Sequence, residues 1–167
     1  MKLSEIETTK YLQILACGSP GSGKTCFAAG FPTPILFLDF DSKVDSAAAW
    51  YAGDKERLDG IDVRSLGNRL DGTDPIQELL KIINDELIPQ QKAGQMKYKT
   101  LVIDSATTFS AAVLRHIIKT NPGIKRVSSS QGMQACVQDY GILKREFMRL
   151  IPGLLSLPLN VVMTAHI

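Results

Sequence analysis

Short hydrophobic runs alternate with longer polar or amphipathic segments along this chain of 167 residues. A continuous hydrophobic run is typical of a strand that is buried on both faces of a sheet, because only an exposed face requires polar side chains. The pattern predicts strands over residues 10–17, 35–40, 61–66, 100–104 and 159–165. Since helical segments separate these strands, we expect an α/β fold, a mainly parallel sheet with helices on both faces.

The segments between the strands carry helix signals. The clearest follows Asp74 and Pro75, which suit an N-cap and a first helical position, and its apolar residues recur on one side up to residue 87. We expect Pro89 to end this helix, and Pro152 with Gly153 to end the last one. The pattern predicts helices over residues 25–29, 45–51 with an extension as far as 58, 74–88, 105–120 and 133–150.

The composition is ordinary for a globular protein, with 44% hydrophobic residues, 22% charged residues and a net charge of +2. We therefore expect one domain over residues 1–167. The polar N-terminus lacks the apolar centre of a signal peptide, and no hydrophobic run reaches the ~18 residues of a membrane span. The three cysteines and two histidines show no metal-ligand spacing, so a zinc site is not expected. These features predict a cytoplasmic protein without membrane contact.

Charge is distributed unevenly along the chain. Residues 39–62 carry seven acidic and three basic side chains, whereas residues 115–150 carry seven basic and two acidic ones. The basic segment is compatible with an anionic polymer, although solvated helix faces give similar counts. Within it, residues 121–132 predict an exposed loop in which Lys125 and Arg126 are candidates for contacts with DNA phosphates. A flexible loop without a ligand is the alternative interpretation.

A glycine-rich segment joins the first predicted strand to the first predicted helix. Gly18, Gly23, Lys24 and Thr25 fit the spacing G-x-x-x-x-G-K-[ST] of a phosphate-binding loop. Glycines let successive N–H groups face the phosphates, the lysine pairs with the β- and γ-phosphates, and the threonine hydroxyl binds Mg²⁺. The segment therefore predicts binding of ATP with Mg²⁺. The residues expected at the nucleotide are Gly18, Ser19, Pro20, Gly21, Ser22, Gly23, Lys24, Thr25 and Cys26.

Carboxylates at the ends of other strands are expected near this loop, because the carboxyl ends of parallel strands meet in one crevice. Asp104 ends a hydrophobic strand and is expected to bind Mg²⁺ with Thr25; its alternative role is an N-cap for the following helix. Asp41, two residues after Asp39, is a candidate to orient or deprotonate the attacking water. His166, at the tip of the last strand, is a candidate to contact the γ-phosphate.

Together these motifs resemble the RecA-like P-loop ATPase core, and they look most similar to phage-encoded nucleotide-binding proteins of the single-strand annealing group. The resemblance rests on the order of GSPGSGKT at 18–25, ILFLDFDSKVD at 35–45, LDGIDVRSL at 58–66, TLVIDSATTF at 100–109 and VVMTAH at 161–166. It implies a three-layer fold of RecA type and catalytic roles for Lys24, Asp41 and His166. Asp41 stands where RecA has a glutamate, so its reach is one methylene shorter.

The resemblance implies further contacts around the nucleotide. Asp45 takes the place of an adenine-contacting acid, whereas the family's adenine-stacking aromatic falls on Ala48. Trp50 or Tyr51 would have to substitute for it, and core packing is the alternative role for this pair. Residues 121–132 correspond roughly to a DNA-binding loop. Because the family binds its nucleotide at a subunit interface, a homo-oligomeric ring or filament is implied.

The leading hypothesis is an Mg²⁺-dependent ATPase that binds and anneals single-stranded DNA in phage or bacterial recombination, in the host cytoplasm if it is phage-encoded. Two alternatives stay open. One is a P-loop kinase of small molecules or nucleotides, although no Arg-rich lid segment is visible. The other is a nucleotide-gated assembly protein with weak hydrolysis. Because nothing after the last strand covers the neighbouring sheet face, we also expect further elements or a partner beyond Ile167.

Overall fold

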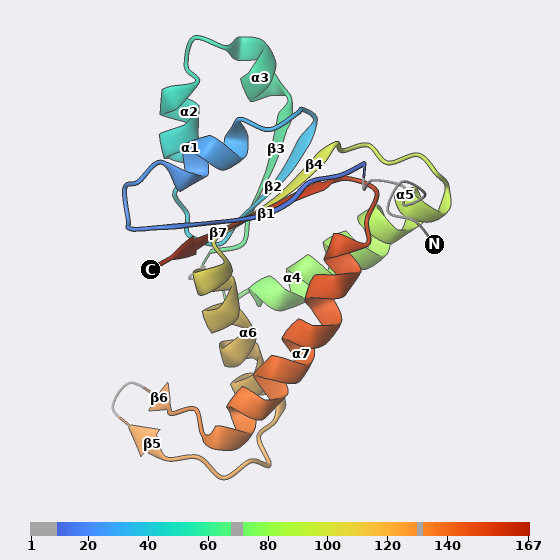
Figure 1. Cartoon of the computed structure of the whole chain (residues 1–167). Helices are drawn as coiled ribbons and strands as arrows, with labels where there is room; N and C mark the ends of the chain where they lie inside the picture. The colour runs from blue at the N-terminus through green and yellow to red at the C-terminus, as the bar shows by residue number, and fades with distance from the viewer. Residues whose placement is uncertain (1–9, 68–71, 130–131) are drawn as a thin grey trace, which may run out of the picture.

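A computed structural model describes residues 10–67, 72–129 and 132–167 of the chain. Within these residues, a five-stranded sheet forms the middle of the molecule (Figure 1). Its strands are β1 (Gln13–Gly18), β2 (Ile35–Asp39), β3 (Ile61–Ser65), β4 (Thr100–Asp104) and β7 (Asn160–His166). They lie in the order β1-β7-β4-β2-β3, and each neighbouring pair is parallel. The predicted α/β fold with a mainly parallel sheet is confirmed.

Helices cover both faces of the sheet and complete a three-layer arrangement (Figure 1). On one face lie α1 (Lys24–Ala29), α2 (Asp45–Trp50) and α3 (Lys55–Asp59). On the other lie α4 (Pro75–Lys81), α6 (Ala106–Thr120) and α7 (Val137–Leu155). In the part of the chain that the structure describes, no helix combines the length and the apolar character needed to span a membrane.

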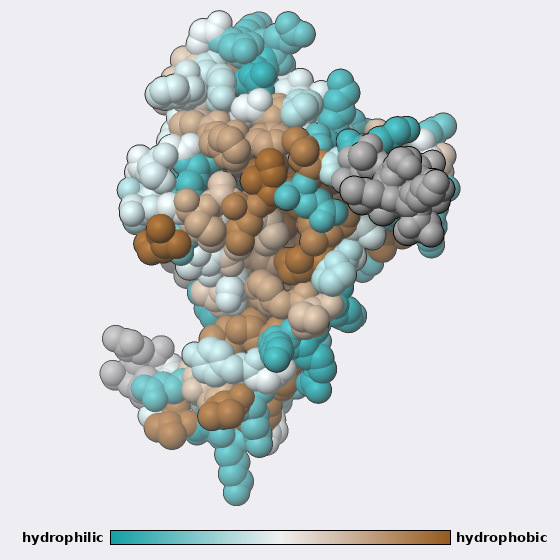
Figure 2. Space-filling model, in the orientation of Figure 1, coloured by the Kyte–Doolittle hydropathy of each residue, from teal (hydrophilic) through white to brown (hydrophobic). Residues whose placement is uncertain are grey.

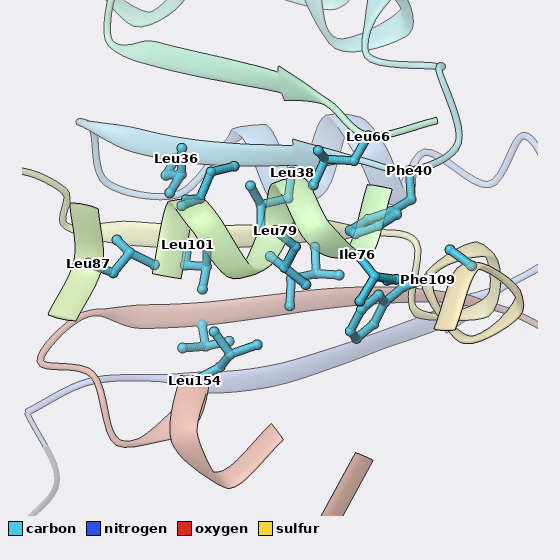
Figure 3. Packing of buried hydrophobic residues seen from close by; sticks show 14 of the residues in the cluster. Leu36, Leu38, Phe40, Leu66, Ile76, Leu79, Leu87, Leu101, Phe109 and Leu154 are labelled. Atoms are coloured by element: carbon cyan, nitrogen blue, oxygen red, sulfur yellow. The ribbon is translucent and has the colours of Figure 1, made fainter. Parts of the chain in front are cut away.

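Alternate residues of the central strands pack into two cores, one on each face of the sheet. Leu36 and Leu38 of β2 join the core under α4, α6 and α7, whereas Ile35 and Phe37 join the core under α1 and α2. This alternation follows from the pleat, which turns successive side chains to opposite faces. Figure 3 shows Leu79 of α4 packed over the strands. Because both faces are covered, β2 and β4 consist entirely of buried residues, which explains their continuous hydrophobic runs.

The edge strand β1 is covered less well than the central strands. Its residues alternate between exposed and half-buried; Leu15 is 60% exposed, and Leu12, which directly precedes the strand, is 57% exposed. Figure 2 shows hydrophobic side chains gathered over the region where β1 lies in Figure 1. The hydrophobic pattern of residues 10–17 therefore predicted the strand correctly but not its exposure.

Two predicted helix bounds are wrong: the extension of the helix at residues 45–51 to residue 58, and the end of the helix at residues 74–88 at Pro89. Residues 45–58 form α2 and a separate α3, because the carboxylate of Asp54 caps α3 by accepting a hydrogen bond from the Arg57 N–H. After α4 the chain continues through a π-helical segment, η2 (Ile82–Leu87), into α5 (Ile88–Lys92). Pro89 is the second residue of α5, directly after the π-helical segment, and does not end the helix.

The predicted bounds of the last helix are also wrong. Residues 133–136 are not helical; β6 (Gly132–Met133) pairs antiparallel with β5 (Ser128–Ser129), and α7 begins after Cys136. At the other end, Pro152 lies inside α7 and does not break it. A proline removes one helical hydrogen bond, but Leu154, two residues further on, is buried in the core, which favours continuation of the helix.

Candidate functional site

The carboxyl ends of the strands gather the predicted site residues at one edge of the sheet. Gly18 of β1 lies opposite His166 of β7 in the strand register, and Asp39 of β2 lies opposite Asp104 of β4. The loop before α1 and the residues that follow β2 leave the sheet at the same edge. Parallel pairing thus brings together segments that are far apart in the sequence.

The loop between β1 and α1 owes its shape to glycine. Gly21 and Gly23 have φ angles of 79° and 84°, in the left-handed region that other residues disfavour. Lys24 bends back over the loop, and its Nζ donates to the carbonyl oxygens of Gly18 and Ser19 at 2.8 Å each. A lysine held against a glycine-rich backbone is the arrangement that binds phosphate groups.

Thr25 and Asp104 meet at the beginning of α1. The Thr25 hydroxyl donates to one Asp104 oxygen over 2.7 Å, and the Thr164 hydroxyl donates to the other. Ser105 is the N-cap of α6, since its Oγ accepts a hydrogen bond from the Thr108 N–H, so Asp104 does not serve as that cap. A hydroxyl beside a buried carboxylate offers the oxygen ligands that Mg²⁺ prefers, and Thr25 and Asp104 would hold this ion.

The described residues contain no group of three or more His, Cys, Asp or Glu side chains that could hold a metal ion by themselves. This finding does not conflict with the Thr25 and Asp104 pair. Mg²⁺ is usually bound through one or two carboxylates together with phosphate oxygens and water. The residues present therefore fit Mg²⁺ that arrives with a nucleotide.

Asp41 is held by side chains from α6 and β7. One of its oxygens accepts hydrogen bonds from the hydroxyls of Thr108 and Ser105, and the other lies 2.8 Å from Nε2 of His166. Burial opposes ionisation of this carboxyl group. The hydrogen bonds from Thr108, His166 and Ser105 nevertheless outweigh burial and lower the pKa of Asp41. Asp41 is therefore an ionised carboxylate with a fixed orientation.

Asp39 has a different environment although it is only two residues away. Its carboxylate is buried and accepts hydrogen bonds from the backbone N–H groups of Lys43 and Val44. Burial raises the pKa of Asp39, the backbone hydrogen bonds oppose the rise, and the charge of Asp104 adds to it. Asp39 thus shapes the turn after β2, whereas Asp41 faces the cavity described below.

His166 connects the end of β7 to its neighbours. Its backbone N–H donates to the Thr107 hydroxyl over 3.0 Å, and its Nε2 contacts Asp41. Nδ1 of the same ring is buried and has no hydrogen-bond partner among the residues that the structure describes. The ring therefore retains hydrogen-bonding capacity that the described residues do not use.

The site residues enclose a cavity of about 660 Å³ between the glycine-rich loop and α2. Trp50 is 74% exposed at this cavity. Tyr51, in contrast, donates its hydroxyl to the Cys26 carbonyl and lies under the guanidinium of Arg57. Of the two, Trp50 is therefore the aromatic side chain available to stack on the adenine base of a nucleotide. The lining comprises Pro20, Gly21, Gly23, Lys24, Thr25, Cys26, Asp41, Ser42, Lys43, Asp45, Ser46, Trp50, Asp104 and His166.

Three of the residues expected at the nucleotide do not line this cavity. Gly18, Ser19 and Ser22 all contact Nζ of Lys24 instead, at 2.8, 2.8 and 3.4 Å. Gly18 is also tightly enclosed, because a Cβ at this position would lie 2.7 Å from the Ser22 hydroxyl. These residues therefore hold the side chain of Lys24 in place without lining the cavity themselves.

The two predicted phosphate contacts in residues 121–132 have different environments. The side chain of Arg126 is 1% exposed and forms a bidentate pair with Asp139, at 2.6 and 2.9 Å. Arg126 and the Cys136 N–H hold the pKa of Asp139 well below its usual range. Arg126 thus fastens this segment to α7, and Lys125 is the exposed member of the pair. Residues 130–131 of the predicted loop lie outside the described residues.

The hydroxyl groups that support the acids were not predicted from the sequence. Thr108 lies in the first turn of the helix after Asp104, and Thr164 lies two residues before His166 on the same face of β7. Each donates to a site carboxylate. The period of two along β7 was the available signal for Thr164, whereas the contact of Thr108 depends on the angle at which α6 leaves the sheet.

Comparison with protein-family models matches residues 10–167 to the AAA domain. A search among curated proteins found no match to the chain. The matched region contains the glycine-rich loop and every strand that contributes to the cavity. The family match supports nucleotide binding and hydrolysis in general. The expected likeness to the phage single-strand annealing group stays a prediction. The chain belongs to the AAA domain family, and it is a P-loop ATPase of AAA type.

Proposed function

We propose that this protein hydrolyses ATP with Mg²⁺ in the cavity beside the glycine-rich loop. One observation carries the proposal: Lys24, Asp41 and Asp104 line the same cavity, and Thr25 is bonded to Asp104. They provide a cation for the phosphates, an oxygen pair for the metal and a carboxylate for the attacking water. Mg²⁺, when bound, neutralises charge on the phosphate oxygens.

Asp41 is the residue proposed to orient the attacking water. Its hydrogen bonds fix the carboxylate and keep it ionised, so that it can accept a hydrogen bond from water. The same hydrogen bonds make it a weak base, because they favour the ionised form. We therefore expect slow hydrolysis. This property also favours a second candidate function, a nucleotide-gated assembly protein, for which ATP binding would be tight and turnover negligible.

His166 is the residue proposed to respond to the γ-phosphate. Its Nε2 contacts Asp41, and the ring lines the cavity. A terminal phosphate would compete with Asp41 for this nitrogen, because both groups are negatively charged hydrogen-bond acceptors. If Nε2 turned to the phosphate, one oxygen of Asp41 would become free to bind water.

We further propose that hydrolysis is coupled to binding and annealing of single-stranded DNA in phage or bacterial recombination. The motif order shared with the RecA-like core and the basic segment 115–150 support this part. Because Arg126 is engaged inside the protein, DNA contacts would come from Lys125 and the other basic side chains. A homo-oligomeric ring or filament, with a neighbouring subunit completing the site, belongs to the same proposal.

Turnover of wild type and Lys24→Ala in ATP and Mg²⁺ tests the proposed hydrolysis. We expect the variant to lose at least about 10²-fold in turnover, because it lacks the cation at the phosphates. Lys55→Ala on α3, which removes an exposed lysine away from the cavity, is the matched control. Persistent turnover in Lys24→Ala, or phosphoryl transfer to a nucleoside or nucleotide, would contradict the proposal. If single-stranded DNA at low salt neither binds nor changes turnover, the recombination part is wrong.

A further inference from the structure

A row of hollows leads from the nucleotide cavity across α6. The first hollow, of about 540 Å³, shares Asp41 and His166 with the nucleotide cavity and reaches Arg115 on α6. The second, of about 180 Å³, also touches Arg115 and lies beside the turn before α4. The third, of about 330 Å³, shares His116 with the second and lies between α6 and α7. Shared side chains therefore connect the nucleotide cavity to the groove between α6 and α7.

Basic side chains line every part of this row. Lys43 and Arg115 line the first hollow, Arg115 and Lys119 the second, and Arg145 and Arg149 the third. Within the described residues, no ion pair engages Arg115, Lys119 or Arg145.

The acids that line the row are already engaged by neighbouring groups. Asp74 accepts hydrogen bonds from the Ile76 N–H and from His116, and Glu146 pairs with Arg149. Asp41 is bonded to Ser105, Thr108 and His166. The free charge that faces the row is therefore positive.

The spacing along α6 links this row to the proposed catalytic carboxylate. Thr108, Arg115 and Lys119 are separated by seven and four residues, so they lie on one face of the helix. Thr108 donates to Asp41 at the nucleotide end of that face. α6 packs against α7, whose Arg145 and Arg149 continue the basic lining (Figure 1). An anion on this helix face would therefore lie on the same side of α6 as the residue that holds Asp41.

We propose that the phosphate backbone of single-stranded nucleic acid binds along this row, at Arg115, Lys119, Arg145 and Arg149. Phosphodiesters carry one charge per nucleotide, which matches basic side chains that recur from hollow to hollow. A flexible single strand can follow a row of small hollows that crosses one helix and enters a groove. A duplex is too stiff to do so. The inference rests on the proposed binding of single-stranded DNA, and it places the main contacts on α6 and α7, with Lys125 of residues 121–132 outside the row.

Two double variants test the contact. Arg115→Ala with Lys119→Ala, and Arg145→Ala with Arg149→Ala, each remove two of the proposed phosphate contacts. Lys55→Ala with Lys92→Ala removes the same charge from exposed positions away from the row. Fluorescence anisotropy with a labelled oligothymidylate is measured at about 50 and 200 mM salt. A duplex of equal length and polyglutamate serve as competitors.

We expect each double variant to bind the oligothymidylate about tenfold more weakly and to lower the salt slope by about 1.4, whereas the control binds as the wild type does. Arg145→Lys with Arg149→Lys keeps the charges and is expected to retain binding, which separates loss of contact from loss of fold. Equal weakening in the control, or no weakening in either double variant, overturns the site. If the duplex or polyglutamate binds more tightly than the oligothymidylate, as judged by displacement of the labelled probe, the proposed ligand is wrong. If the wild type hydrolyses ATP but binds no nucleic acid, this inference and the proposed recombination role fail, whereas the proposed hydrolysis stands. If the wild type binds the oligothymidylate and neither double variant weakens binding, only the site proposed here is wrong.

Discussion

Thr108 is one of three side chains that hold Asp41, together with Ser105 and His166. Its hydroxyl donates to the carboxylate that we propose to orient water. Thr108→Val keeps the shape but removes one of the hydrogen bonds that lower the pKa of Asp41, so this pKa rises. We expect turnover to fall about tenfold. The acidic limb of the pH–rate profile should move to higher pH, because turnover requires ionised Asp41.

Two further variants separate positioning by Thr108 from a general effect on α6. Thr108→Ser keeps the hydroxyl and should restore both turnover and the pH profile. Ser110→Ala removes a hydroxyl from the same helix, at a side chain without a hydrogen bond within the described residues. An unshifted pH profile in Thr108→Val, or an equal loss in Ser110→Ala, would show that Thr108 does not position Asp41.

Trp50 offers a direct readout of the nucleotide, because it is the only tryptophan in the chain. Its ring is exposed at the cavity, whereas Tyr51 is engaged with Cys26. We expect ATP to quench the tryptophan emission of the wild type. Trp50→Ala should weaken ATP binding about tenfold in calorimetry, since stacking on a base contributes about 1–3 kcal/mol. Trp50→Phe is the control that keeps an aromatic ring. Unchanged affinity in Trp50→Ala would rule out stacking on this residue.

At the scale of elements, the pair of Arg126 and Asp139 fastens the segment between α6 and α7. Arg126→Met keeps much of the volume but leaves the Asp139 carboxylate buried without its cation. The segment should then open more often, and trypsin should cleave after Lys125 about tenfold faster in limited proteolysis followed by mass spectrometry. Arg149→Met, which breaks an exposed pair with Glu146, is the control. Equal cleavage rates in the two variants would mean that the buried pair does not hold the segment.

The strands were predictable from the sequence because β2 and β4 are buried on both faces, so that the inner positions of both strands are all hydrophobic. Helix ends were less predictable, since continuation past Pro89 and Pro152 depends on packing with distant segments. The same distinction holds at the site. Asp41 and Asp104 were predictable because they follow parallel strands, whereas the hydrogen bond from Thr108 depends on how α6 packs.

For the whole molecule, we expect low pH to reduce the free energy of unfolding. Hydrogen bonds lower the pKa of Asp62, Asp139 and, against the effect of burial, Asp41 and Asp74. A carboxyl group whose pKa is lower in the folded chain stabilises the fold above its unfolded pKa, and this contribution is lost as pH falls through the folded pKa. Asp39, whose pKa is raised chiefly by burial, acts in the opposite sense and offsets part of the loss. We expect the free energy of unfolding to decrease below about pH 4.

Asp139→Asn tests how much of this acid sensitivity comes from the pair with Arg126. Asparagine keeps the shape but cannot ionise, so the variant should be less stable at neutral pH and should lose less stability on acidification. Urea unfolding at about pH 7 and pH 3 measures both quantities. Asp85→Asn, at an exposed carboxyl group without a partner among the described residues, should follow the wild type. If Asp139→Asn loses as much stability as the wild type between these conditions, the acid sensitivity arises elsewhere. Its candidates would then be the other carboxyl groups whose pKa is lowered, which are Asp41, Asp62 and Asp74.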